Sequence, residues 1–246
     1  MPGAVTVEDL EVRYGQRVAL QDCSLSLPAG STLAVIGPNG SGKSTLLRAI
    51  AGLERPTRGR IDTGGERVAL VLQSTDVDRS VPISVRATVR MARYATLGLL
   101  RRFRAEDHRA VDEALDRLEL TDLADRQLHE LSGGQRQRVL VAQGLAQDAA
   151  VLLLDEPVTG LDVVSRDRIL DVVAAERDAG RAIAVTTHDL DDAGRCDQVL
   201  LLATRPIALG TPAEVLCEEH LLRAFDGRFL RVGDRLLLDD PHHHAH

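Results

Sequence analysis

The stretch GPNGSGKST, which runs from Gly37 to Thr45, holds the only lysine of this 246-residue chain. The other 29 of its 30 Lys and Arg side chains are arginine, so lysine at this position is not a general preference of the sequence. Lysine carries a compact ammonium on a flexible stem, whereas arginine carries a wide planar fork. Lys43 therefore indicates a narrow opening, lined by backbone, that admits only a point charge.

The surroundings of Lys43 fit the pattern G-x-x-x-x-G-K-S/T, which begins at Gly37. A compact apolar run precedes it and a helical pattern follows. Glycines let backbone N–H groups surround a phosphate, and the helix N-terminus adds partial positive charge. An ordinary glycine-rich turn is the alternative. We expect nucleotide contacts from Gly37, Pro38, Asn39, Gly40, Ser41, Gly42, Lys43, Ser44 and Thr45.

Strand-like and helical patterns alternate along the chain. Short apolar runs predict buried strands, and apolar residues at helical spacing predict helices between them. Such alternation favours an α/β fold with a mostly parallel sheet covered by helices on both faces. The residue pattern from Ser74 to Glu130 is helical and indicates a helical segment inserted between strands of the sheet. The strands are expected within 5–15, 31–37, 67–73, 151–157 and 182–189, and the helices within 43–53, 106–120 and 134–147.

The composition argues against several classes of function. A net charge of -7 and 2% aromatic residues disfavour a nucleic-acid partner, which needs basic and stacking surfaces. The three cysteines are far apart in the sequence and are expected to be reduced packing residues. No apolar run approaches the ~20 residues of a membrane span, and no signal-peptide pattern is visible. We expect a cytoplasmic protein that can still dock on a membrane protein.

Asp155 and Glu156 follow the apolar run VLLL. Ligands bind at the carboxyl ends of parallel strands, so this acidic pair is expected beside the phosphate loop. Asp155 would hold Mg²⁺ through water while Ser44 ligates the ion directly, and Glu156 would activate the attacking water. An acidic pair after a strand can also simply start a helix.

The segment LSGGQ holds Ser132, Gly133, Gly134 and Gln135 at the expected start of a helix. It offers a second anion-binding N-terminus but has no lysine and no preceding strand. The economical interpretation is that it covers the γ-phosphate of a nucleotide held by a second copy of the chain. The alternative is a serine N-cap followed by a flexible glycine pair.

Taken in order, GPNGSGKST, LVLQST, LSGGQ, LLLDEP, GLD and TTHD resemble the motifs of the ATP-binding cassette ATPases over nearly the whole chain. This resemblance implies a P-loop NTPase (RecA-like) core, an N-terminal antiparallel β subdomain and an inserted helical subdomain at about 74–135, within a nucleotide-binding domain spanning 1–238. ATP and Mg²⁺ are the implied substrate and cofactor.

The resemblance also implies roles for four single residues. Tyr14 is expected to stack on adenine, and Gln73 to contact Mg²⁺ and the attacking water. Asp162 is expected to communicate across a dimer, and His188 to contact the γ-phosphate. Gln143 and Gly144 stand where the family usually has arginine and alanine. We expect this departure to loosen the packing of the helix.

Only 89 residues lie between Gly42 and Ser132, which leaves no room for the long coiled coil of chromosome-maintenance cassettes. The chain resembles the separate ATPase subunit of a transporter. This implies an ATP-bound homodimer, a multi-spanning permease, a solute-binding protein and a location on the inner face of the membrane. The permease is expected to dock on 74–104, with Val85 and Leu97 in the contact.

The cargo is indicated only indirectly. Ser80–Tyr94 and Arg205–Leu216 resemble zinc and manganese uptake ATPases, and the tail 239–246 is rich in histidine. These features favour import of a divalent metal ion. Three alternatives stay open: an importer of another substrate, an exporter, and a soluble regulatory ATPase. The tail is equally compatible with a segment that binds no metal.

Overall fold

The computed structural model describes residues 4–73, 82–97, 102–225, 229–232 and 235–238. Its centre is a six-stranded sheet with the strand order β5-β6-β7-β3-β8-β9. The first five strands run parallel, and β9 pairs antiparallel with β8. These strands are β5 (Val68–Val71), β6 (Val151–Asp155), β7 (Ala182–Thr186), β3 (Thr32–Ile36), β8 (Gln198–Ala203) and β9 (Arg205–Gly210).

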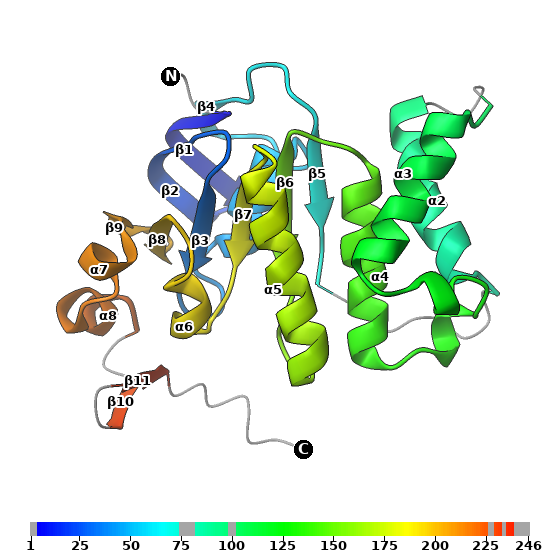
Figure 1. The fold of residues 1–246 in the computed structure, drawn as a ribbon. Helices are drawn as coiled ribbons and strands as arrows, with labels where there is room; N and C mark the ends of the chain where they lie inside the picture. Colours follow the sequence, from blue (N-terminus) through cyan, green and yellow to red (C-terminus); the bar gives the residue numbers. More distant parts are fainter. Residues whose placement is uncertain (1–3, 74–81, 98–101, 226–228, 233–234, 239–246) are drawn as a thin grey trace.

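Every residue of β3, β6 and β7 is buried, because both faces of the sheet are covered. One face packs on α1 (Lys43–Ile50) and on a three-stranded antiparallel sheet of β2 (Arg17–Leu27), β1 (Val5–Tyr14) and β4 (Arg58–Asp62). Figure 1 shows this smaller sheet, in blue and cyan, near the N-terminus and beside the main sheet. It is the antiparallel subdomain that the resemblance implied.

The opposite face is covered by α5 (Val163–Asp178) and the short α6 (Leu190–Ala193), which lie in front of the strands in Figure 1. Near β8 and β9 the chain adds α7 (Pro212–Val215) and α8 (Glu218–Phe225). The last described strands, β10 (Phe229–Val232) and β11 (Arg235–Leu238), form an antiparallel hairpin. The histidine-rich tail lies outside the described residues.

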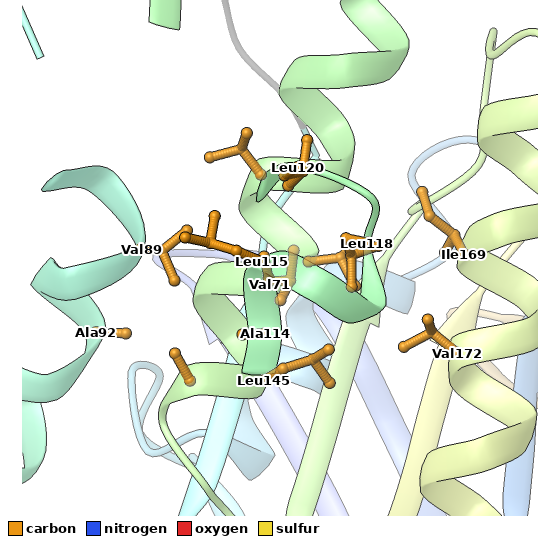
Figure 2. Close-up of a cluster of buried hydrophobic side chains, with 14 of the residues drawn as sticks. Val71, Val89, Ala92, Ala114, Leu115, Leu118, Leu120, Leu145, Ile169 and Val172 are labelled. Carbon is orange, nitrogen blue, oxygen red and sulfur yellow. The ribbon is translucent and has the colours of Figure 1, made fainter. Parts of the chain in front are cut away.

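The inserted helical segment packs beside β5. It contains α2 (Val85–Leu97), α3 (Ala105–Arg117), the 3₁₀ turns η1 (Thr121–Leu123) and η2 (Leu128–Glu130), and α4 (Gly133–Ala146). Figure 2 shows how apolar side chains from these helices, from β5 and from α5 meet in one cluster. Val111, Leu115 and Leu118, spaced for one helix face, are all buried there.

A buried ion pair also ties the helices together. The Arg93 guanidinium donates to the Asp107 carboxylate at 2.7 and 2.9 Å and to the carbonyl of Ala146 at 3.0 Å. The backbone N–H of Arg104, and then the Arg93 guanidinium, hold the pKa of Asp107 below its usual value against the opposing effect of burial. This pair joins α2 and α3 to the end of α4.

Two sequence expectations need correction. Val85 is completely buried at the start of α2, so it cannot belong to a docking surface. The loosening expected at Gly144 is absent, because a Cβ at this position would lie 2.4 Å from Cγ2 of Val71. The glycine thus permits a close approach of α4 to β5. Gln143 adds a hydrogen bond of 3.2 Å to the Thr88 carbonyl of α2.

Candidate active site

The strand order gathers the predicted site at one edge of the sheet. Gln73 follows β5, the pair Asp155 and Glu156 ends β6, His188 follows β7, and Gly37 follows β3. Since β5, β6, β7 and β3 are parallel neighbours in that order, their carboxyl ends lie side by side. That edge is where open α/β sheets bind ligands.

The phosphate loop between β3 and α1 is shaped by glycines and closed by the lysine. Gly37 and Gly42 have φ angles of 153° and 103°. Their missing side chains let the loop approach Leu202 and Ala19, whose carbonyl oxygens would lie 2.0 and 2.6 Å from an added Cβ. Lys43 is buried, and its Nζ donates to the Gly37 carbonyl at 2.8 Å and to the Pro38 carbonyl at 3.2 Å.

The hydroxyl of Ser41 is also buried in this loop, and it has no hydrogen-bond partner within the described structure. An unpartnered hydroxyl in a ring of glycines fits a polar ligand such as a phosphate oxygen. Ser44 and Thr45 are partly exposed in the first turn of α1, and Asn39 and Gly40 are exposed at the tip of the loop.

The β1–β2 hairpin brings a positive charge to this loop. Tyr14 ends β1, is exposed, and pairs in register with Arg17 of β2. The guanidinium of Arg17 lies 3.7 Å from the position of a Cβ on Gly40. No motif singles out Arg17, and only the folding of the hairpin onto the loop brings its positive charge to the phosphate-binding tip.

The acidic pair at the end of β6 is held by one threonine. The buried Thr186 of β7 donates its hydroxyl to Oδ1 of Asp155 at 2.7 Å and accepts the backbone N–H of Glu156 at 2.8 Å. Glu156 has a φ of 48°, a left-handed conformation that costs a non-glycine residue about 1–2 kcal/mol. Strain of this kind persists where neighbouring contacts enforce it.

The side chain of Glu156 faces the loop glutamine. Nε2 of Gln73 donates to Oε2 of Glu156 at 3.4 Å, a long hydrogen bond that places the two residues in one site. The two residues are 83 positions apart in the sequence and meet because β5 and β6 are neighbours. This contact agrees with the sequence-based grouping of Gln73 with the acidic pair.

The segment that carries His188 is braced by α5. Asp189 caps α6 by accepting the backbone N–H groups of Asp191 and Asp192 at 2.8 and 3.1 Å. Arg166 of α5 pairs with Asp189 at 3.1 Å and with Asp192 at 2.6 Å. Burial, and then the nearby Asp189, raise the pKa of Asp192. Arg166 therefore links the helix that begins after Asp162 to the loop of His188.

The signature segment opens α4 instead of following a strand. Ser132 is the N-cap, and its hydroxyl accepts the backbone N–H of Gln135 at 3.2 Å while the Gln135 side chain accepts the N–H of Ser132 at 3.0 Å. Gly134 packs so closely on the start of α5 that an added Cβ would lie 2.6 Å from Oδ2 of Asp162. Ser132 and Gly133 are exposed.

Asp162 is exposed and caps α5 by accepting the backbone N–H of Ser165 at 2.9 Å. That amide, followed by the Ser165 hydroxyl, lowers the pKa of Asp162. The next two residues, Val163 and Val164, are 71% and 69% exposed. Adjacent exposed valines beside a capped helix start form an apolar surface that nothing in the described chain covers.

The residues at the sheet edge fit Mg²⁺ by their chemistry. The Ser44 hydroxyl, the Asp155 carboxylate and the Gln73 amide offer hard oxygen ligands, which Mg²⁺ prefers together with water and phosphate oxygens. Within the described ranges there is no group of three or more His, Cys, Asp or Glu side chains that could hold a metal by themselves.

A phosphate loop after β3 and an acidic pair after β6 define a P-loop ATPase. Comparison with known families is more specific, because the family model described as "ABC transporter" matches residues 20–159. The chain belongs to the ABC transporter family and is an ATP-binding cassette ATPase. Across the described part of the chain, no helix is long and apolar enough to cross a membrane.

The chain is 38% identical over 234 residues to the manganese transport system ATP-binding protein MntA of Synechocystis, covering 91% of this chain and 90% of that protein. It is also 38% identical to the zinc transport system ATP-binding protein TroB of Treponema pallidum, covering 92% and 88%. A solved ABC transporter, assigned to the metal-chelate type and in an inward-facing conformation, matches with a TM-score of 0.82 at 29% identity, covering 95% and 94%.

Proposed function

We propose that this chain is the ATP-hydrolysing subunit of an ABC importer for a divalent metal ion such as manganese or zinc. The observation that carries the catalytic part is the sheet order. The loop with Lys43, the pair Asp155 and Glu156, and Gln73 all lie at the carboxyl ends of parallel strands on one edge of the sheet. The identity to manganese and zinc transport ATP-binding proteins over nearly the whole chain supports the cargo.

The roles of the site residues follow from their positions. Lys43 and the N–H groups of the loop Gly37–Thr45 bind the β- and γ-phosphates, and Tyr14 stacks on adenine. Glu156 accepts the proton of the attacking water. Gln73, whose Nε2 lies 3.4 Å from Oε2 of Glu156, helps to orient that water. His188, braced through Asp189, contacts the γ-phosphate.

Ser44, Gln73 and Asp155 would hold Mg²⁺, with Asp155 acting through water. When bound, this ion neutralises charge on the β- and γ-phosphate oxygens. The buried hydrogen bond from Thr186 engages Oδ1 of Asp155, so Oδ2 is the carboxylate oxygen that would accept a hydrogen bond from water on the ion. The hydroxyl of Ser44, partly exposed at the start of α1, would supply the direct ligand.

The functional unit is a homodimer in the ATP-bound state. In one copy the phosphate loop grips the nucleotide, and in the other Ser132, Gly133, Gly134 and Gln135 cover its γ-phosphate. Two observations support this arrangement: Ser132 and Gly133 are exposed at a helix N-terminus, and Val163 and Val164 form an exposed apolar surface beside them. Asp162 lies between these two features and links them.

A multi-spanning permease, with a solute-binding protein outside the membrane, completes the importer, and this chain sits on the inner face. Of the expected docking segment 74–104, residues 74–81 and 98–101 and the side chain of Leu97 lie outside the described residues. On the described part of α2, Met91 and Tyr94 are 52% and 40% exposed. Tyr94 contacts the Phe103 ring edge-on at 5.1 Å, and Arg90 lies over the same ring at 4.7 Å. We place the permease contact on Met91 and Tyr94.

Uptake of radioactive manganese and zinc tests the cargo. Cells that lack this chain should lose uptake of one of these metals, and the wild-type chain should restore it. Glu156→Gln should fail to restore it, because the variant cannot accept the proton. Met91→Glu combined with Tyr94→Glu should fail to restore uptake while purified protein keeps its ATPase activity.

Two outcomes would contradict the proposal in different ways. Unchanged uptake of both metals in cells that lack an active ATPase would favour an importer of another substrate or an exporter. A chain that hydrolyses ATP but never copurifies with a membrane protein would favour the soluble regulatory ATPase.

A further inference from the structure

The side chain of Thr186 is hydrogen-bonded to both members of the acidic pair. It is the last residue of β7, it is completely buried, and it lies in register with Asp155 of β6. Its hydroxyl has a single proton. Since the Glu156 N–H can only donate, the hydroxyl accepts there at 2.8 Å and gives its proton to Oδ1 of Asp155 at 2.7 Å.

We propose that Thr186 is a positioning residue that holds the Mg²⁺-binding carboxylate of Asp155 and the backbone of the general base Glu156 in one fixed arrangement. This inference rests on the function proposed above. Asp155 is fixed through its side chain and Glu156 through its main chain, so one oxygen atom sets the geometry of both groups.

The backbone of Glu156 needs such a restraint. With a φ of 48°, Glu156 leaves the strand in a left-handed conformation, and this turn aims its side chain at Gln73. Without the hydrogen bond, the Glu156 N–H would be left without its acceptor at the end of a buried strand. The chain would then gain by relaxing towards an ordinary φ, which moves the carboxylate away from Gln73.

The matched variants are Thr186→Val and Thr186→Ser. Valine keeps the β-branched shape and removes the hydroxyl, whereas serine keeps the hydroxyl and removes the methyl group. Thr32→Val is the control. Thr32 is equally buried in the same sheet, and its hydroxyl likewise accepts an N–H, from Asp197 at 2.9 Å, and donates to a carboxylate oxygen of the same Asp197 at 2.8 Å. It lies at the opposite, amino-terminal end of β3.

The first measurement needs neither nucleotide nor metal. Amide hydrogen exchange of the free, full-length chain should show faster exchange at Glu156 in Thr186→Val than in the wild type. Thr186→Ser should keep the protection, and Thr32→Val should leave it unchanged while raising exchange near Asp197. Equal protection at Glu156 in Thr186→Val and wild type would overturn the proposal, because the hydroxyl would not hold the turn.

The second measurement is steady-state ATP hydrolysis as a function of ATP and of Mg²⁺. Loss of a residue that orients a metal ligand typically lowers activity or metal affinity by about 10–100-fold. Thr186→Val should lower kcat by about this factor and raise the Mg²⁺ concentration for half-maximal activity. Binding of Mg²⁺-free ATP should be unchanged, because the loop around Lys43 is intact.

If Thr186 only stabilised the fold, Thr186→Val would lower kcat in step with thermal stability. Thr32→Val measures how much kcat falls through loss of stability alone. A kcat for Thr186→Val within about twofold of Thr32→Val would overturn the proposal, as would a serine variant as slow as the valine variant. If Thr186→Val does not fold, Thr186→Ser decides, since near-normal kcat supports the proposal and a large loss overturns it. A wild-type chain that hydrolyses no ATP would overturn the proposed function and the inference with it, even with protection at Glu156 intact.

Discussion

At the residue scale, the structure gives a physical reason for the chain's single lysine. Nζ of Lys43 is buried and is held by the carbonyl groups of Gly37 and Pro38 in a loop with little free space. An ammonium can leave these two carbonyls for a phosphate without moving the loop. A guanidinium, with its planar fork, would meet the closely packed backbone around Gly37.

We therefore predict that Lys43→Arg fails nearly as completely as Lys43→Ala. Loss of one charged donor to a transition state typically costs about 3–4 kcal/mol, or 10²–10³ in kcat. ATPase kinetics on the purified chain measure this effect. Arg48→Lys is the control, since Arg48 is exposed on the same helix, and should be near-normal. A Lys43→Arg protein with wild-type kcat would contradict the explanation by loop space.

Gly144 gives a second prediction at this scale. Alanine is favoured over glycine within helices by about 1 kcal/mol, yet a Cβ here would lie 2.4 Å from Cγ2 of Val71. We expect Gly144→Ala to lower the free energy of unfolding by about 1–3 kcal/mol. Chemical denaturation tests this, with Gly133→Ala as control because its Cβ would meet nothing within 4 Å. Adding Val71→Ala should recover part of the free energy of unfolding lost in Gly144→Ala, because it removes the clashing methyl group. If the effects of the two substitutions on the free energy of unfolding simply add, the cause is not steric.

At the element scale, the packing of α2, α3 and α4 depends on a buried ion pair that the sequence pattern does not predict. Asp107 lies within the charged run of α3, yet it is fully buried against Arg93. Removing one partner of a buried ion pair leaves the other charge uncompensated, at a cost of about 3–5 kcal/mol. Asp107→Asn should destabilise the helical segment by roughly this amount. Asp112→Asn, which breaks an exposed pair with Arg86, should change stability by less than about 1 kcal/mol.

The same pair gives a pH dependence with a definite sign. The pKa of Asp107 is lowered in the folded protein, so the folded state favours the carboxylate more than the unfolded state does. Its contribution to stability is therefore complete above the unfolded pKa near 3.9 and is lost as pH falls through the lower folded pKa. Wild-type stability should fall more steeply below about pH 4 than that of Asp107→Asn. Parallel curves in acid denaturation would show that Asp107 is not the responsible group.

Elements and site residues differ in how far the sequence predicts them. Fully buried strands such as β3, β6 and β7 follow from apolar runs, and Asp155 follows from its place at a strand end. Gln73 follows only from the resemblance to the ATP-binding cassette ATPases. Thr186 and Arg17 carry no such signal, because their importance comes from contacts with residues distant in the sequence. The burial of Asp107 could not be predicted for the same reason, because a charge is buried only where another helix supplies its partner. Val85 shows the converse error, an apolar residue assigned to the surface that belongs to the core.

At the scale of the whole molecule, each half of the proposed nucleotide site faces outward from its own chain. The phosphate loop lies at the sheet edge, while Ser132 opens α4 beside the exposed Val163 and Val164. Shared sites of this kind make ATP part of the interface between two copies. In the proposed dimer, hydrolysis would release the contact by removing the bridging charge. A chain that binds ATP but cannot hydrolyse it should therefore accumulate in the closed, two-copy state.

Glu156→Gln tests this prediction, because glutamine keeps the shape of the side chain but cannot accept the proton. The variant should bind Mg·ATP, lose at least ~10² in kcat, and form a stable dimer with two nucleotides, which light-scattering mass with and without ATP measures. Adding Ser132→Arg should abolish the dimer while ATP binding by each monomer persists. Adding Val164→Asp is the matched second test, since this exposed side chain can be charged without disturbing the N-cap. A Glu156→Gln protein that binds ATP yet stays monomeric, alone and in the presence of its permease, would rule out the shared site.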